Sequence, residues 1–185
     1  LEESGFIRRY TPFGKKSRES LYQLSDFFSL FHLKFMGSKN TDKNSWLKMI
    51  DNPKYRSWSG YAFEQVCMSH VPEIKKALGI EGVEAHVFSW RSQNQENGAQ
   101  IDLVIDRRDG VINVCEMKFS LHPFSIDKKY DAELRNKIGV FKTETKTGKS
   151  VFLTMLTTFG LQENIYAGNV QNDLDMNLLF DDQLI

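Results

Sequence analysis

Residues 100–118 read Gln100-Ile-Asp-Leu-Val-Ile-Asp-Arg-Arg-Asp-Gly-Val-Ile-Asn-Val-Cys-Glu-Met-Lys118, two alternating apolar runs on either side of a short polar turn. Strand side chains alternate between two faces. One face of the first run then holds only apolar residues, namely Ile101, Leu103 and Ile105, and the other holds Asp102, Val104 and Asp106. The second run places four residues on one face, namely Ile112, Val114, Glu116 and Lys118.

The turn decides whether Asp102 meets Glu116. A three-residue loop over 108–110, closed by Gly110 with positive φ, pairs Asp106 with Ile112, Val104 with Val114, and Asp102 with Glu116. Opposed β-carbons lie roughly 4.5–5.5 Å apart, where like charges destabilise a pair, so this register indicates a cation between the carboxylates. A two-residue turn at Asp109-Gly110 is the alternative, and it would place Met117 opposite Asp102.

The length and composition of the chain indicate one soluble domain plus a smaller accessory segment. The 185 residues are 41% hydrophobic and 26% charged with zero net charge, so contact with a polyanion requires local basic patches. No apolar run reaches the roughly 20 residues of a membrane span, and no signal peptide is found. Cys67 and Cys115 fall in apolar segments, which predicts reduced thiols and a cytoplasmic protein with no membrane partner. The four histidines lack metal-ligand spacing, which disfavours zinc.

The first 36 residues form a separate pattern. Residues 1–5 resemble the last turn of a helix, so we expect the chain to be a fragment of a longer protein. Two strand-like runs, 6–13 and 20–24, flank a basic loop, as in the wing of a winged-helix domain, and a solvated loop is the alternative. A helix over 26–35, capped by Ser25, carries an aromatic stripe typical of core or interdomain packing, namely Phe27, Phe28, Phe31 and Phe35. The polar stretch 37–45 follows, which divides the chain into 1–36 and 37–185.

The second part alternates helices and strands. We expect a short helix over 46–50, ended by Asn52-Pro53, then a helix opened by Ser57 or Ser59 that restarts at Pro72 and stops at Gly79. Strands are predicted over 83–90, in the central hairpin, over 151–156 as a buried central strand, and over 176–180. The helix at 127–146 presents the best basic surface, which includes Lys128, Lys129, Arg135, Lys137 and Lys142. This order predicts an α/β fold.

The chain resembles the PD-(D/E)XK nuclease superfamily over about residues 55–158. The resemblance is carried by Asp102, by Glu116-Met-Lys118 and by Glu64 on a preceding helix. The resemblance implies a restriction-endonuclease-like mixed central sheet flanked by helices. Ile101 stands where the superfamily usually has proline before the aspartate.

Three fragments resemble the C-terminal domain of archaeal-type AAA ATPases more specifically, namely residues 58–64, 98–105 and 115–119. In that family a winged helix joins the ATPase to the nuclease-like domain. The resemblance therefore implies that residues 1–36 are a winged-helix remnant, a β-hairpin wing plus linker helix, and that an ATPase domain lies upstream in the same polypeptide. No Walker motif occurs here.

The resemblance also implies the roles of individual residues. Asp102, Glu116 and the Met117 backbone carbonyl would bind Mg²⁺ or Mn²⁺, with Glu64 supporting the site or holding a second metal. Lys118 would act on the attacking water and the phosphate. Gln100 would orient substrate, and Lys128, Lys129 and Arg135 would contact phosphates. The expected function is metal-dependent hydrolysis of DNA. The alternatives are a non-catalytic DNA-binding or protein-interaction module of an ATPase and, for the site itself, a surface ion cluster.

Overall fold

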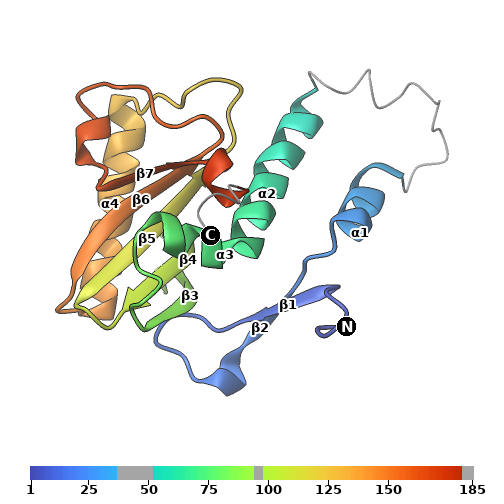
Figure 1. Ribbon diagram of the computed structural model, residues 1–185, viewed down its shortest axis with the longest axis horizontal. Coiled ribbons are helices and arrows are strands. Elements are labelled where there is room, and N and C mark those ends of the chain that lie inside the picture. Colours follow the sequence, from blue (N-terminus) through green and yellow to red (C-terminus); the bar gives the residue numbers. More distant parts are fainter. Residues whose placement is uncertain (37–51, 94–97, 181–185) are drawn as a thin grey trace.

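The computed structural model describes residues 1–36, 52–93 and 98–180 (Figure 1). A five-stranded sheet has the order β3-β4-β5-β6-β7, with β3 over Ala85–Arg91, β4 over Gln100–Arg107, β5 over Val111–Lys118, β6 over Ser150–Thr157 and β7 over Asn172–Asp175. β3, β4 and β5 are antiparallel, whereas β5, β6 and β7 are parallel. The predicted α/β fold with a mixed central sheet is thus confirmed.

Helices cover both faces of this sheet. α2 (Pro53–Ser69) and α3 (Val71–Ala77) pack on one face, where Phe63, Cys67 and Ile74 contact Leu103 and Cys115. α4 (Lys128–Thr145) covers the other face (Figure 1). Its side of the core is made by Val104, Ile112, Val114, Leu134, Phe141, Leu153 and Met155. Alternation along β5 separates the two cores, because neighbouring residues of a strand point to opposite faces.

The central hairpin has the predicted loop. β4 ends at Arg107 and β5 begins at Val111, and Gly110 has φ +87°, the conformation that favours glycine. The register pairs Asp106 with Ile112 and Val104 with Val114. The three-residue loop is therefore confirmed over the two-residue alternative.

A β-bulge interrupts β4 next to Asp102. Phe88 pairs with Val104 but Trp90 pairs with Ile101, so two residues of β4 oppose Ser89 alone. Ile101 consequently packs with Val104 in the core under α4, and the prediction that Ile101 shares a face with Leu103 and Ile105 is wrong. The extra residue turns Asp102 to the side of the sheet that α2 covers.

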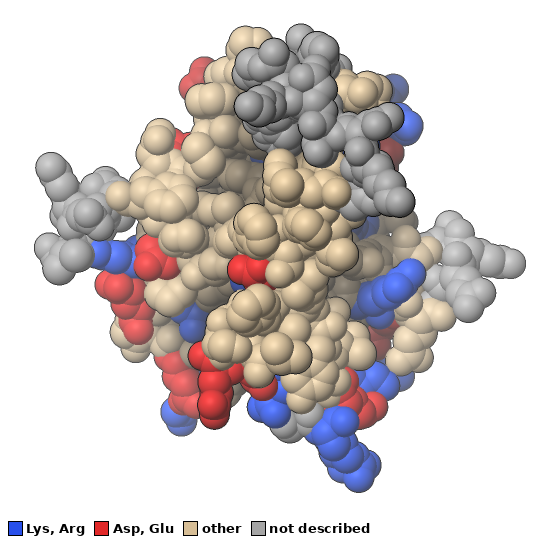
Figure 2. All heavy atoms as spheres, turned by 90° about the vertical axis from the view of Figure 1, so that its right-hand side faces the viewer, with Lys and Arg blue, Asp and Glu red and all other residues tan. Residues whose placement is uncertain are grey.

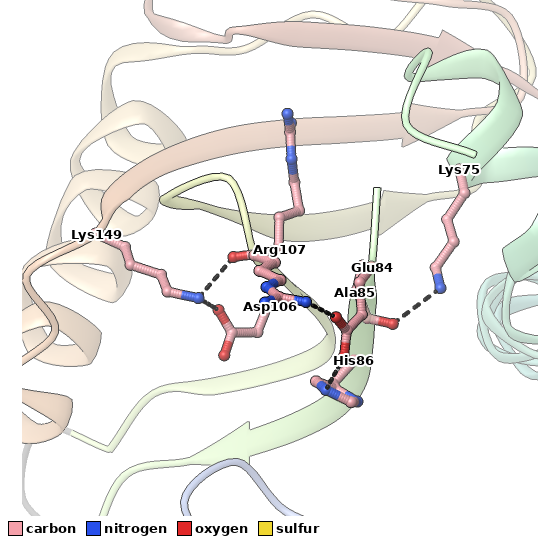
Figure 3. A network of polar contacts seen from close by, with 8 residues as sticks. Lys75, Glu84, Ala85, His86, Asp106, Arg107 and Lys149 are labelled. Carbon is pink, nitrogen blue, oxygen red and sulfur yellow. Dashed lines mark hydrogen bonds and ion pairs between the residues drawn. The ribbon is translucent and has the colours of Figure 1, made fainter. Parts of the chain in front are cut away.

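The turn end of the hairpin is held by paired charges (Figure 3). Lys149 donates to the Asp106 carboxylate and to the Arg107 carbonyl, both at 2.6 Å. Arg108 bridges to Glu84 at 2.7 Å, and the Lys75 ammonium donates to the Ala85 carbonyl at 3.2 Å. These contacts tie β3, β4, the start of β6 and α3 together at this end.

The N-terminal residues form the predicted hairpin. β1 (Ile7–Tyr10) and β2 (Leu21–Leu24) are antiparallel, and a short 3-10 turn, η1 (Ser17–Glu19), precedes β2. The hairpin is anchored to the main sheet: the Phe13 amide donates to the Ser89 carbonyl at 2.7 Å, and the Phe13 ring lies 5.4 Å from the rings of Phe88 and Phe141. The strands of the hairpin lie nearer α2, where Arg8 Nη2 donates to the Ser69 hydroxyl at 2.8 Å.

The aromatic helix covers the predicted length, but only its first part is α-helical. α1 spans Phe27–Phe31, Asp26 rather than Ser25 caps it, and a π-helical turn, η2, continues over His32–Met36. Phe31 and Phe35 pack against Trp58 of α2, as predicted for core packing. Phe27 and Phe28 are exposed instead. Figure 2 shows a broad area of mostly uncharged side chains with an acidic side chain near its centre and charged side chains below it.

Two predicted boundaries are wrong. α2 begins at Pro53, with the Asn52 side chain accepting from the Lys54 amide at 2.9 Å, because proline suits the first helical position as well as the residue after a helix. Residues after β7 form a 3-10 helix, η5 (Met176–Leu179), where a strand was predicted. A further 3-10 turn, η4 (Ala167–Asn169), precedes β7. The predicted linker at 37–45 and helix at 46–50 lie outside the described residues.

The two cysteines are reduced, as predicted. Cys67 and Cys115 are free and buried in one core, and burial raises the pKa of the Cys67 thiol to about 12. Among the described residues, no helix combines the length and the apolar character needed to cross a bilayer.

Candidate active site

Three carboxylates and a lysine lie at the open end of the central hairpin, opposite its turn. Glu64 comes from the middle of α2, Asp102 from the bulge of β4, and Glu116 and Lys118 from the end of β5. The β4–β5 pairing ends at Leu103 and Cys115, one step before Asp102 and Glu116. The two strands therefore hold these acids at the point where their ladder stops.

Glu116 is nearly buried and has partners on both oxygens. Only 8% of the residue is exposed. Its Oε1 accepts from the Tyr130 hydroxyl at 3.0 Å and lies 3.2 Å from the Lys118 ammonium, while its Oε2 lies 2.5 Å from Lys137 Nζ. Burial alone would raise the pKa of Glu116, but Lys137 and Lys118 outweigh it and lower the pKa, so Glu116 is an ion held in place by two cations.

Tyr130 completes this group from α4. Burial and the neighbouring Glu116 charge raise the pKa of its hydroxyl, which keeps Tyr130 neutral and a hydrogen-bond donor. The Lys118 ammonium lies 5.4 Å from the centre of the Tyr130 ring. Glu116 and Lys118 share the face of the sheet under α4, as the alternation of β5 predicted.

Glu64 has no hydrogen bond or ion pair within the described part of the chain. Burial, the Asp102 charge and, to a smaller extent, the Glu116 charge raise the pKa of Glu64 to about 7, against the opposing effect of Lys118 and Lys137. A carboxyl whose pKa is raised by burial and by a neighbouring carboxylate is a common setting of a functional acid. Glu64 and Asp102 line the same cavity.

Asp102 accepts a hydrogen bond from Gln100 Nε2 at 2.8 Å. It lines a cavity of about 210 Å³ together with Glu64 and Gln65 of α2. Glu116, by contrast, contacts α4. Asp102 and Glu116 thus approach the open end from opposite sides of the sheet, a correction to the predicted same-face pair that follows from the β4 bulge.

The predicted phosphate contacts do not join this group. Lys128 and Lys129 are exposed, and Lys129 lies 3.8 Å from Glu133. Arg135 is paired with the buried Asp131 at 2.7 Å. Sequence reasoning included Lys137 in a basic surface but gave it no role in the site. Tyr130 and Lys137 are seven residues apart, which is two helical turns, so their shared position on the sheet-facing side was the available signal.

The donor set suits a hard cation, although the described side chains do not enclose one. Carboxylate oxygens are the ligands that Mg²⁺ and Mn²⁺ prefer. Within residues 1–36, 52–93 and 98–180, no three His, Cys, Asp or Glu side chains converge closely enough to hold an ion. Glu116 would exchange Lys137 for a metal, and Asp102 and Glu64 would supply the other oxygens. The Met117 side chain is buried in the core under α2.

Comparisons with known proteins found one structural neighbour. No family model matches the chain, and no curated protein matches it. A crystal structure of a protein of unknown function, AF1548, is similar at a TM-score of 0.42 with 19% sequence identity over 63% of this chain. The chain spans 64% of that protein's length. A likeness at this level assigns no function.

Proposed function

We propose that the chain is a metal-dependent nuclease domain that hydrolyses phosphodiester bonds in DNA. The observation that carries the proposal is that Glu64 and Asp102 line one cavity at the open end of the hairpin, with Glu116 at the end of the neighbouring strand. Burial and, to a smaller extent, the Asp102 charge raise the pKa of Glu64 to about 7, and a bound cation would offset the cost of ionising it there.

Asp102 and Glu116 would hold Mg²⁺ or Mn²⁺, with Glu64 and the Met117 carbonyl as further oxygen donors. The metal supplies charge stabilisation at the reacting phosphate and a more acidic bound water. Lys118, whose ammonium lies 3.2 Å from Glu116, would orient that water and neutralise a phosphate oxygen. Gln100 fixes the Asp102 carboxylate through its 2.8 Å hydrogen bond, a positioning role rather than the substrate contact expected from sequence.

Lys137 would leave Glu116 when the metal binds. Its ammonium lies 2.5 Å from Glu116 Oε2, the oxygen that would bind the metal. The long, flexible lysine side chain would let the ammonium move away. Once displaced, Lys137 would contribute positive charge beside the substrate phosphates. It would take the role that the sequence analysis gave to Lys128, Lys129 and Arg135, which lie away from the site. An attached ATPase domain and a DNA partner belong to the same proposal.

Calorimetric titration with Mn²⁺ tests the metal site. We expect binding by the wild type and its loss in Asp102→Ala, with loss of plasmid nicking in parallel. Asp106→Ala provides the matched control, because Asp106 lies on the same strand but pairs with Lys149 at the turn end. It should keep both Mn²⁺ binding and nicking. Equal Mn²⁺ binding by the wild type and Asp102→Ala would contradict the proposal.

A non-catalytic module of an ATPase is the second candidate. The full pairing of Glu116 by Tyr130, Lys118 and Lys137 favours it, since an acid already neutralised internally needs no metal. This reading predicts no Mn²⁺ binding and no nicking of duplex, single-stranded or branched DNA, together with DNA binding that depends on the N-terminal hairpin.

A further inference from the structure

A single basic residue, Arg91, lines the cavity beside Asp102 within the described part of the chain. The cavity, of about 210 Å³, lies between α2, the N-terminal hairpin and the open ends of β3 and β4. Its acids are Glu64 and Asp102, two of the carboxylates of the candidate site. Arg91 therefore brings positive charge to a cavity that is otherwise acidic.

The alternation of β3 turns Arg91 toward this cavity. Phe88 and Trp90 pack in the core under α4. Because neighbouring strand residues point to opposite faces, Arg91 faces the other side of the sheet, the one that α2 covers. Its partner across the ladder is Gln100, whose side chain donates to Asp102 at 2.8 Å. The guanidinium of Arg91 and the Asp102 carboxylate thus belong to the same face and the same end of the sheet.

The backbone next to Arg91 is fixed by hydrogen bonds. The Ser92 amide donates to the Ala99 carbonyl at 2.8 Å. The Ser92 hydroxyl and the Gln93 amide both donate to the Glu144 carboxylate of α4, at 2.5 and 3.1 Å. The Arg91 side chain itself is exposed. A fixed attachment point with a solvent-facing guanidinium suits a residue that has to position a ligand.

The Arg91 side chain has no hydrogen bond or ion pair with any described part of the chain. By contrast, Arg107, Arg108 and Arg135 each pair with an acid. An arginine without an acid partner is available for an anion. Its planar fork of N–H donors fits two oxygens of one phosphate.

Two uncharged side chains of the lining can assist such an anion. Ser89 of β3 carries a hydroxyl and Gln23 of β2 carries an amide, and both line the cavity. Hydroxyls, amides and arginines make the usual contacts to DNA phosphates. The acids alone would repel a phosphate, but a metal ion on Asp102 would remove that repulsion. The lining therefore favours a phosphate between Arg91 and the metal site.

We propose that Arg91 binds a backbone phosphate of the DNA strand, next to the phosphate at which hydrolysis occurs. This inference rests on the proposed function and adds to it a substrate-positioning residue. The whole chain has zero net charge, so attraction for DNA has to come from individual basic groups of this kind. The strand runs from the cavity to the open end of the central hairpin, and Leu21 and Gln23 of the N-terminal hairpin border it.

The salt dependence of DNA binding tests the Arg91 contact without metal or cleavage. A fluorescently labelled duplex and one of its strands alone are titrated with the whole chain in EDTA, and binding is followed by anisotropy. Each phosphate contact contributes about 0.7–0.9 to the slope of log K against log salt concentration. We expect Arg91→Met to reduce the slope by this amount. Its affinity should fall about tenfold at roughly 50 mM salt and about threefold at roughly 200 mM. An unchanged slope, or no binding of either probe by the wild type, would overturn the inference.

Two further variants separate this contact from a general effect of charge. Arg91→Lys keeps the charge but loses the planar fork, so it should keep the wild-type slope and bind about threefold more weakly. Arg108→Met removes the same charge at the turn end, where Arg108 pairs with Glu84, and should change neither slope nor affinity. Equal losses in Arg91→Met and Arg108→Met would contradict a specific contact, as would a slope that falls in Arg91→Lys.

Calorimetric titration with inorganic phosphate separates a strand from a free anion. We expect no saturable binding at about millimolar concentrations, because one exposed arginine holds a lone anion weakly. Millimolar binding that Arg91→Met removes would assign the site to a small anion instead of a strand.

The outcomes for Arg91 and for the proposed nuclease are distinguishable. If the wild type binds Mn²⁺ and nicks DNA but its salt slope does not depend on Arg91, the inference fails and the proposed function stands. If the slope depends on Arg91 without Mn²⁺ binding or nicking, the phosphate contact stands and the domain is a non-catalytic DNA-binding module.

Discussion

The two ends of the central hairpin both carry acidic and basic side chains, but these side chains pair differently at each end. At the turn end each acid has a basic partner: Asp106 pairs with Lys149, Asp109 with Arg107, and Glu84 with Arg108. Glu84 also lies 3.8 Å from the His86 ring. At the open end Glu116 binds two lysines, while Asp102 and Glu64 have no ion-pair partner in the described part of the chain. Acids that are matched by nearby bases hold strands together, whereas acids without such partners are available for a ligand.

Lys118→Met should produce the largest change at the open end. We expect nicking to fall about 10²–10⁴-fold, the usual contribution of a group that assists proton transfer. Mn²⁺ affinity should stay within about threefold, since Lys118 acts on water and phosphate. Nicking rates and calorimetry measure the two effects. Lys149→Met makes the same change at the turn end and should leave nicking intact. Parallel loss of Mn²⁺ affinity would show instead that Lys118 mainly positions the carboxylates.

Lys137→Met sharpens the comparison because it removes the internal competitor for Glu116. In EDTA we expect a loss of roughly 1–3 kcal/mol in the free energy of unfolding. The variant removes one of the two ammonium groups beside the nearly buried Glu116, while Lys118 and Tyr130 remain. Mn²⁺ should bind several-fold more tightly, since no ammonium has to be displaced. Urea unfolding with and without Mn²⁺ measures both changes. Weaker Mn²⁺ binding would mean that Lys137 supports the metal site rather than competing with it.

Glu64→Gln should stabilise the metal-free protein in a pH-dependent manner. The pKa of Glu64 in the folded protein is about 7, above its ordinary value of 4.5. Stability from the bound proton is therefore complete below about pH 4.5 and is lost as the pH rises through 7. Glutamine keeps the neutral form, so the variant should be roughly 1–3 kcal/mol more stable at pH 8 and nearly unchanged at pH 4.5.

Thermal melts in EDTA across this range test the prediction for Glu64. Glu81→Gln removes one negative charge at an exposed position after α3 and serves as the reference. A difference between Glu64→Gln and wild type that is the same at pH 4.5 and pH 8 would contradict the assigned shift.

Arg108→Met should have the smallest effect. Arg108 and Glu84 form an exposed ion pair, and such pairs contribute less than about 1 kcal/mol. The melting temperature should change by only a few degrees at most, and Mn²⁺ binding and nicking should be unchanged. A large effect on Mn²⁺ binding would show that the turn end and the open end are coupled, against the distinction drawn between them.

Local signals explain what the sequence predicted well. Gly110 after Asp109 specified the hairpin loop and hence the register, because a positive φ there favours glycine. The predicted helix start at residue 127 is within one residue of the start of α4, because the Asp127 side chain caps the helix by accepting from the Tyr130 amide at 2.7 Å. Alternation placed Glu116 and Lys118 on one face. Each of these features depends on a few neighbouring residues.

Tertiary pairing explains what the sequence did not reveal. The bulge that redirects Asp102 arises from the register of β4 against Ser89 of β3, and residues 101–103 carry no glycine or proline to mark it. Lys137 reaches Glu116 only because α4 lies on the sheet in one particular rotation.

The parallel pairing of β5 with β6 has a consequence for the order of folding. Asp106 and Ile112 pair across a short loop, so the β4–β5 hairpin forms by local contacts, whereas Val111 meets Ser150 only after the chain has passed through α4. Local contacts form faster than distant ones, because closing a long loop loses more chain entropy. We therefore expect Asp102 and Glu116 to stand in water, without Tyr130 and Lys137, in the earliest compact states. Divalent ions present at that stage would meet these acids before the crossover helix arrives, so the refolding rate should depend on whether Mn²⁺ is added before or after the chain collapses.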